Sequence, residues 1–209
     1  MKSHLKLMTP TTDLRTVGTK PMPKRHPNTN YRTREYLTED EVDRLIAALR
    51  KNRYGQRDAL MALVAYRHGL RVSELIDLRW DDVDWTKATL HVRRLKGSDK
   101  ATHPILGDEL RALRKLQREQ EQKSAFVFVS ERGAPFTRAG FARMVERAGE
   151  AAKISFPIHP HMLRHACGHA LANKGHDTRS LQAFLGHRNI QHTVRYTSLT
   201  PAAFKNFWR

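Results

Sequence analysis

Apolar residues recur at helical spacing where the regular part of the sequence begins. In LTEDEVDRLIAAL, Thr38 and Glu41 form a capping-box pattern. It precedes a stripe of apolar residues about one turn apart: Val42, Leu45, Ile46 and Leu49. This pattern predicts an amphipathic helix. A second helix is predicted across 56–68, where Gly69 ends it, and a third begins in RVSELIDL.

The hydrophobic period changes at about residue 83. From there to about 106, short apolar runs joined by polar turns predict a small antiparallel meander. Helical spacing returns with Leu110, Leu113 and Leu116, and AFVFVS (125–130) is either a short buried strand or an extended run before a turn in ERGAP. The remaining predicted helices are 137–152, 160–174, 178–185, 190–197 and a short terminal one in PAAFKNFW. We therefore expect a mainly α fold with a small antiparallel β-sheet (α+β).

Residues 1–36 differ from the rest of the chain. They hold eight Lys and Arg against two acids, a net charge of +6, and four of the nine prolines, with no apolar periodicity. This composition predicts a flexible basic arm that becomes ordered on a partner, although residues 1–20 also fit a purely solubilising tail. Residues 37–209 are then the folded domain. Subtracting the arm (17 − 6) leaves +11 on that domain.

The whole chain carries 38 Lys and Arg against 21 Asp and Glu, a net charge of +17. A charge of this size is typical of proteins that bind a polyanion, although a merely basic solvated surface is the alternative. The longest apolar stretch, ALMALVA, is too short to cross a bilayer, and no secretory leader pattern is present. We therefore expect nucleic acid rather than membrane as the partner, and a cytoplasmic, nucleoid-associated location. The single cysteine excludes an intramolecular disulfide.

Histidines gather in HPHMLRHACGHA, residues 159–170, and two kinds of site fit them. His165 and His169 are four residues apart, which is the spacing of zinc ligands on a helix. No Asp or Glu lies between 151 and 176 to complete the ligand set or act as base, so we expect no metal.

His161 and Arg164 instead form a phosphate-binding pair, one turn apart and close to a helix start after Pro160. Phosphodiester chemistry needs two cations, a base and an acid. Further candidates for these roles lie elsewhere in the sequence: Arg71 and Glu74 in HGLRVSEL, His187 in LGHRN, and Tyr196 in HTVRYTSL.

The order Arg, Lys, His-x-x-Arg, His, Tyr across residues 37–208 resembles the tyrosine recombinases, and within them the short DNA invertases that switch fimbrial genes. This resemblance implies a tyrosine recombinase catalytic domain that cleaves and rejoins DNA without metal or cofactor, through a 3′-phosphotyrosyl link. It also implies the roles of individual residues: Tyr196 as nucleophile, Arg71 and Arg164 on the phosphate oxygens, His161 as general base, His187 as a phosphate hydrogen-bond donor, Lys96 as general acid, and Glu74 as support for the guanidinium of Arg71.

The chain departs from the family pattern in two places. Its hairpin is one residue longer and lacks the usual arginine, so Lys100 remains an alternative to Lys96 as the acid. It also lacks room for a separate N-terminal core-binding domain, which suggests a weaker grip on DNA, supplied by the arm and by accessory DNA-bending proteins.

The same resemblance implies duplex DNA with short inverted-repeat sites as substrate and a synaptic tetramer, with inversion, integration and excision all open. The remaining expectations are that His165 and His169 pack or cap, that His192 and Arg195 meet the DNA backbone or flank the site, and that Phe204, Phe207 and Trp208 dock on a neighbouring protomer. A catalytically silent DNA-binding regulator and a zinc hydrolase are the alternative functions.

The basic arm predicts a steep salt dependence of DNA binding. With six to ten phosphate contacts, affinity falls roughly 10³–10⁵-fold between 50 and 200 mM salt. Deleting residues 1–36 reduces the slope of log affinity against log salt in a fluorescence titration. An unchanged slope would show that the arm does not touch DNA.

Overall fold

The structure is a computed structural model that describes residues 34–94, 101–120 and 124–197. Its helices are α1 (Glu39–Leu49), α2 (Gly55–Arg67), α3 (Val72–Ile76), α4 (Gly107–Glu119), α5 (Arg138–Ala151), α6 (His161–Asn173), α7 (Thr178–Leu185) and α8 (Gln191–Thr197). A 3₁₀ turn, Trp80–Asp82, leads into the strands β1 (Val83–Asp84), β2 (Thr89–Val92) and β3 (Ala101–Pro104). The predicted class, mainly α with a small antiparallel sheet, is confirmed.

The start of α1 follows the sequence pattern. The Thr38 hydroxyl accepts a hydrogen bond from the Glu41 backbone N–H at 3.3 Å, and the Glu41 carboxylate accepts one from the Thr38 N–H at 2.9 Å. These bonds satisfy two donors that a helix start leaves without partners. The apolar stripe of α1 is buried, as predicted.

The strands form the antiparallel order β1-β2-β3, with Leu90 of β2 facing Val83 on one side and His103 on the other. The AFVFVS segment is an extended run and not a strand of this sheet. Its Val127 N–H donates to Leu78 O at 2.9 Å, and Val127 and Phe128 are fully buried.

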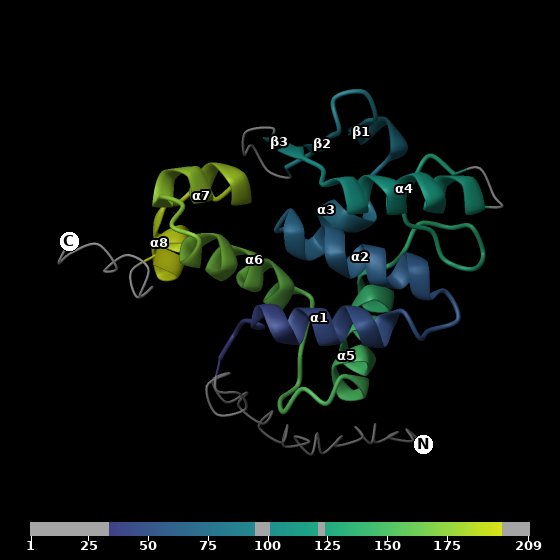
Figure 1. Cartoon of the computed structure of the whole chain (residues 1–209), viewed down its shortest axis with the longest axis horizontal. Coiled ribbons are helices and arrows are strands. Elements are labelled where there is room, and N and C mark those ends of the chain that lie inside the picture. The colour runs from purple at the N-terminus through teal and green to yellow at the C-terminus, as the bar shows by residue number, and fades with distance from the viewer. Residues whose placement is uncertain (1–33, 95–100, 121–123, 198–209) are drawn as a thin grey trace, which may run out of the picture.

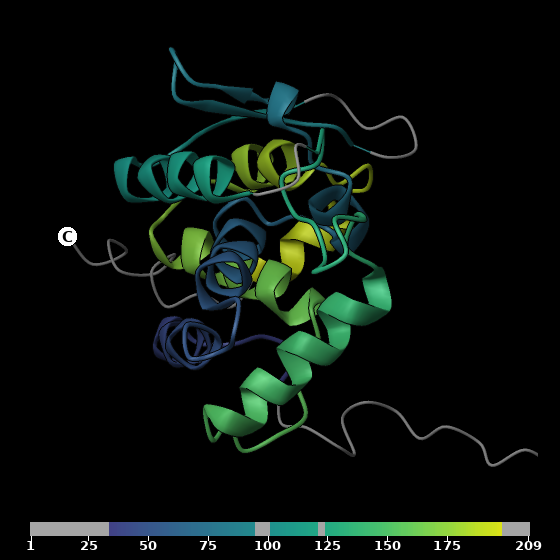
Figure 2. The same ribbon diagram turned by 90° about the vertical axis from the view of Figure 1, so that its right-hand side faces the viewer.

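Two hydrophobic cores hold the helices. The larger core joins α1, α2, α5 and the start of α6 to the sheet, and the smaller core lies among the rest of α6, α7 and α8 and includes Leu181, Leu185 and Tyr196. In Figure 1 the sheet and α4 lie along one edge, α1 and α5 lie along the opposite edge, and α6 to α8 extend to one side. Figure 2 keeps the sheet and the far end of α5 at opposite ends of the molecule. The C-terminal helices thus form a lateral layer with its own core.

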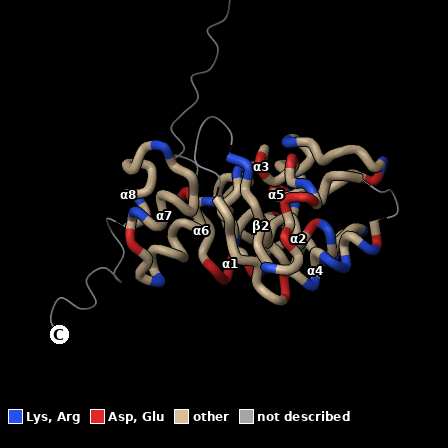
Figure 3. Tube along the Cα trace, turned by 90° about the horizontal axis from the view of Figure 1, so that it is seen from above, with Lys and Arg blue, Asp and Glu red and all other residues tan. Residues whose placement is uncertain are grey.

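Residues 34–36, the last three of the predicted arm, lie against the folded body. Arg34 pairs with Glu41 at 2.5 Å, and the ring of Tyr36 lies 3.8 Å from that of His169. The rest of the arm, the hairpin with Lys96 and Lys100, and the terminal segment with Phe204, Phe207 and Trp208 lie outside the described residues. Along the parts that are described, basic residues follow α4 and gather again over α7 and α8 (Figure 3). None of the described helices is both long and apolar enough to cross a membrane.

Candidate active site

The C-terminal end of α7 is where the candidate residues meet. Gly186 ends this helix in the left-handed conformation, with φ at +65°. Carbonyl groups in the last turn of a helix have no partner within it, and they attract cations. Each of the last three carbonyls accepts a hydrogen bond from a different arginine: Phe184 O from Arg94 Nη2, Leu185 O from Arg164 Nη2 (2.6 Å), and Gly186 O from Arg71 Nη2 (3.4 Å).

The Glu74 carboxylate joins the same three arginines from the other side. Its Oε1 accepts from Arg71 Nη1 at 2.7 Å, and its Oε2 accepts from Arg94 Nη1 at 2.8 Å and lies 4.0 Å from Arg164 Nη1. Glu74 is 1% exposed, so this pairing is shielded from water. Three guanidinium groups around one carboxylate leave an excess of positive charge. Such an excess suits a phosphate.

The three arginines differ in their exposure. Arg71 has 34% of its side chain exposed, whereas Arg94 and Arg164 are buried. Burial, with the charges of Arg71 and Arg94, lowers the pKa of Arg164 to about 10, which leaves it charged at neutral pH. Arg164 also donates to the carbonyl of Gly69, at the end of α2. The buried pair is therefore a fixed part of the fold, and Arg71 extends the cluster to the surface.

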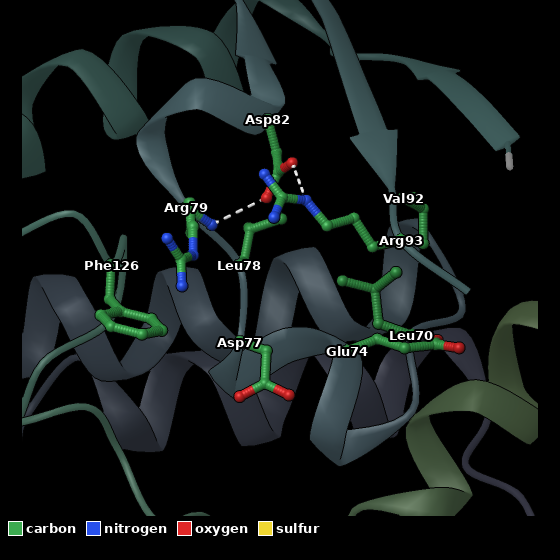
Figure 4. Close-up of a pocket in the computed structure, with 9 residues that line it drawn as sticks. All are labelled: Leu70, Glu74, Asp77, Leu78, Arg79, Asp82, Val92, Arg93 and Phe126. Carbon is green, nitrogen blue, oxygen red and sulfur yellow. Dashed lines mark hydrogen bonds and ion pairs between the residues drawn. The ribbon is translucent and has the colours of Figure 1, made fainter. Parts of the chain in front are cut away.

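Arg94 was not among the predicted site residues. It follows β2, on the inward side shared by Leu90 and Val92, while its neighbour Arg93 turns outward. Figure 4 shows Arg93 reaching Asp82 across the cleft between α3 and β2, and its Nε donates to Asp82 Oδ1 at 2.6 Å. Asp82 Oδ2 accepts from the Arg79 backbone N–H at 2.9 Å. Adjacent arginines thus attach the end of β2 to two carboxylates on opposite sides.

His161 and His187 flank the arginine cluster as neutral side chains. Burial, and next the charge of Arg164, lower the pKa of His161 to about 4 and that of His187 to about 3. His187 Nδ1 shares a hydrogen bond with the Thr193 hydroxyl at 2.8 Å. If Nδ1 accepts, the Nε2–H of His187 is free to donate to an anion.

Tyr196 lies flat against α6 and is 2% exposed. Its hydroxyl lies 2.7 Å from His165 Nδ1, and its ring meets the His169 ring edge-on at 5.1 Å. Gly168 makes this seat possible, because a Cβ there would lie 2.7 Å from the Tyr196 ring. Burial raises the pKa of Tyr196, against the opposing charge of Arg164.

The structure brings together all the predicted residues that it describes. Arg71 and Glu74 come from the start of α3, His161 and Arg164 from α6, and the remaining two, His187 and Tyr196, from the end of α7 and from α8. Lys96 lies outside the described residues. Sequence reasoning missed Arg94, Gly168 and Thr193. It also assigned His165 to packing or capping, yet His165 contacts the tyrosine hydroxyl.

The histidines of α6 do not form a cluster suited to a metal. Within residues 34–94, 101–120 and 124–197, no group of three His, Cys, Asp or Glu side chains is placed to hold a metal ion. His161 and His165 meet through their rings, edge to face at 4.7 Å.

Comparison with known proteins relates this arrangement to a family. Residues 35–202 match the phage integrase family. The type 1 fimbriae regulatory protein FimE of Escherichia coli K12 is 42% identical over 180 residues, covering 84% of this chain and 91% of FimE. The crystal structure of XerA recombinase matches with a TM-score of 0.71 at 31% identity, over 83% of this chain and 63% of that one. XerH bound to its difH substrate matches with a TM-score of 0.70 at 20% identity, over 84% and 55%, which shows the shared fold.

The packing of the Tyr196 ring on Gly168 can be tested by a double-mutant cycle. In the wild-type background, Gly168→Ala places a methyl group against a buried ring, and overpacking of this kind costs about 1–3 kcal/mol. In a Tyr196→Ala background the clash is gone, and the same change stabilises α6 by about 1 kcal/mol, the helix preference of Ala over Gly. Urea denaturation measures both values. Gly107→Ala, where the nearest atom to the added Cβ is the flexible tip of Arg111 at 3.4 Å, is the control. Equal effects in both backgrounds would contradict the close contact.

Arg94 and Arg93 form a matched pair for a test of burial. Arg94→Met leaves the buried Glu74 carboxylate short of a partner, and breaking a buried ion pair costs about 3–5 kcal/mol of unfolding free energy. Arg93→Met lowers the unfolding free energy less, because 59% of the Arg93 side chain is exposed. The Asp82 carboxylate still accepts a hydrogen bond from the Arg79 backbone N–H in that variant. Chemical denaturation compares the two variants. A smaller loss of unfolding free energy for Arg94→Met than for Arg93→Met would contradict the importance of the buried pair between Arg94 and Glu74.

Proposed function

The chain belongs to the phage integrase family of tyrosine recombinases, and we propose that it is a site-specific recombinase that cuts and rejoins duplex DNA through Tyr196. The observation that carries this proposal is that Arg71 and Arg164 share the buried Glu74 carboxylate. His161 lies one turn from Arg164, and the ring of His187 stacks on that of Tyr196 at 6.2 Å. His161, His187 and Tyr196 all lie close enough to Arg164 for its charge to lower their pKa values.

In the proposed reaction, the Tyr196 oxygen attacks the scissile phosphorus while Arg71 and Arg164 neutralise the non-bridging oxygens. The bond to the 5′ oxygen breaks, leaving a 3′-phosphotyrosyl link and a free 5′-hydroxyl. His161, which is neutral at pH 7, is the proposed acceptor of the tyrosine proton. Lys96 gives the proton to the leaving oxygen, with Lys100 as its alternative. Attack by a partner strand's hydroxyl reverses these steps.

His187 and Glu74 support this chemistry. His187 donates Nε2–H to a phosphate oxygen while Thr193 holds its other nitrogen. Glu74 keeps the guanidinium of Arg71 oriented by accepting from both its side chain and its backbone N–H. Because Tyr196 is 2% exposed, DNA can reach its hydroxyl only after a local movement that uncovers it.

The proposed substrate is duplex DNA with short inverted repeats, and the proposed outcome is inversion, which the resemblance of the motifs to those of the short fimbrial DNA invertases favours. In the solved XerH complex that recombinase holds its DNA substrate, and the net charge of +17 fits a similar partner here. We extend the proposal to a synaptic tetramer, to accessory DNA-bending proteins and to a DNA-contacting arm at residues 1–36. With DNA as the substrate, we propose that this activity takes place in the cytoplasm, at the nucleoid.

A nicked suicide duplex tests the reaction directly. Wild-type protein forms an adduct with this DNA that survives denaturation, because loss of the short cleaved fragment traps the phosphotyrosyl link. Tyr196→Phe forms none, since it lacks the attacking oxygen. EDTA leaves the yield unchanged. Gel electrophoresis of the denatured reaction measures the adduct.

The other outcomes discriminate between functions. DNA binding without any wild-type adduct would indicate the catalytically silent regulator, and loss of activity in EDTA would indicate a metal-dependent enzyme. An adduct with Tyr196→Phe would show that another residue is the nucleophile.

A further inference from the structure

His165 touches the proposed nucleophile, although neither the phosphate clamp nor the proposed proton transfers use it. Its Nδ1 lies 2.7 Å from the Tyr196 hydroxyl oxygen, a normal length for a strong hydrogen bond. The two residues are on different helices, 31 positions apart in the sequence. This bond therefore fixes the end of the Tyr196 side chain on the surface of α6.

His165 is a suitable acceptor in this bond when its proton is on Nε2. Burial, and next the charge of His161, lower the pKa of His165 to about 3, so its imidazole is neutral at pH 7. A neutral imidazole has one acceptor nitrogen and one donor. With its proton on Nε2, Nδ1 accepts from the tyrosine O–H. In this arrangement Nδ1 receives the tyrosine O–H without taking its proton, so the contact orients the hydroxyl.

The position of His165 on α6 brings the Tyr196 hydroxyl close to other residues of the proposed site. His165 follows Arg164 directly, and it lies one turn beyond His161 on the same face. Gly168 and His169 hold the tyrosine ring further along the helix. The ring of Tyr196 thus packs on Gly168 and His169, and its hydroxyl bonds to His165. The oxygen is therefore held beside the helical turn that carries Arg164 and His161.

We propose that His165 is a positioning residue for the nucleophile, whose fixed acceptor nitrogen holds the Tyr196 oxygen beside the phosphate clamp before attack. The inference rests on the proposed function of Tyr196. It adds a residue that the motif set Arg71, Lys96, His161, Arg164, His187 and Tyr196 does not contain. Loss of the acceptor lets the Tyr196 side chain shift, and misplacement of the attacking oxygen slows the reaction without weakening DNA binding.

The test compares two variants of His165 in single-turnover cleavage of a nicked duplex, at saturating full-length protein. His165→Ala removes the acceptor and lowers the cleavage rate roughly ten- to a hundredfold, while the DNA dissociation constant stays within about twofold of wild type. His165→Asn places an amide oxygen near the position of Nδ1 and restores most of the rate. His176→Ala, which removes an exposed histidine after α6, cleaves at the wild-type rate.

Rescue by asparagine separates positioning from packing, because Asn fills less space than His yet keeps an acceptor. A His165→Ala rate equal to or above wild type would overturn the inference, and so would a His165→Asn rate no better than that of Ala. In both cases wild-type adduct formation still supports Tyr196 as the nucleophile. Absence of any wild-type adduct would instead contradict the proposed function itself.

A measurement on resting protein covers the case in which His165→Ala fails to fold. In nitrogen-15 NMR of histidine-labelled protein, Tyr196→Phe removes the hydroxyl and keeps the ring, so the Nδ1 resonance of His165 shifts. The resonance of His176 stays in place. An unchanged His165 resonance would show that the hydrogen bond does not form in solution and would overturn the inference.

Discussion

At the end of α7, three carbonyl groups have no hydrogen-bond donor within the helix, and the contacts that assemble the site form around them. Arg71, Arg94 and Arg164 supply the missing donors, and Glu74 holds the same guanidinium groups from the opposite side. Each arginine is therefore oriented by neutral carbonyls as well as by a carboxylate. Carbonyl groups compensate a guanidinium only partly, so the cluster keeps the positive charge that a phosphate needs. One unpaired helix end thus both joins α3, β2 and α6 and prepares the site for an anion.

Much of the fold, and part of the site, could be predicted because local sequence patterns indicate them. The capping box and apolar stripe predict α1, and the change of period predicts the sheet. For the site, Arg71 and Glu74 share one short motif, as do His161 and Arg164, so helix spacing alone relates the members of each pair. The identity and order of these motifs then indicated the family, which the comparisons confirmed. That the separate motifs belong to one site was predicted from the resemblance to the family, because helix spacing cannot relate residues a hundred positions apart.

What could not be predicted depends on contacts between distant segments. Alternation in TLHVRR does place Arg94 on the inward side with Leu90 and Val92, which is a usable signal for a buried arginine. Its partners, however, are the Glu74 carboxylate and a carbonyl of α7, and neither is visible from β2. The role of Gly168 is similar. A glycine within a helix costs stability, so its presence indicates a close neighbour, but only the packing of α8 shows that the neighbour is Tyr196.

The arginine cluster also has a consequence for the order in which the protein is synthesised. Arg71 and Glu74 leave the ribosome long before residues 184–186, whose carbonyls orient the guanidinium groups, and Tyr196 follows later still. A chain cut short before α7 therefore carries the arginines without the carbonyls that orient them. A chain that ends between Gly186 and Tyr196 has those carbonyls but lacks the proposed nucleophile. Truncation in this short interval would separate the proposed binding of a phosphate from the proposed cleavage of its ester bond.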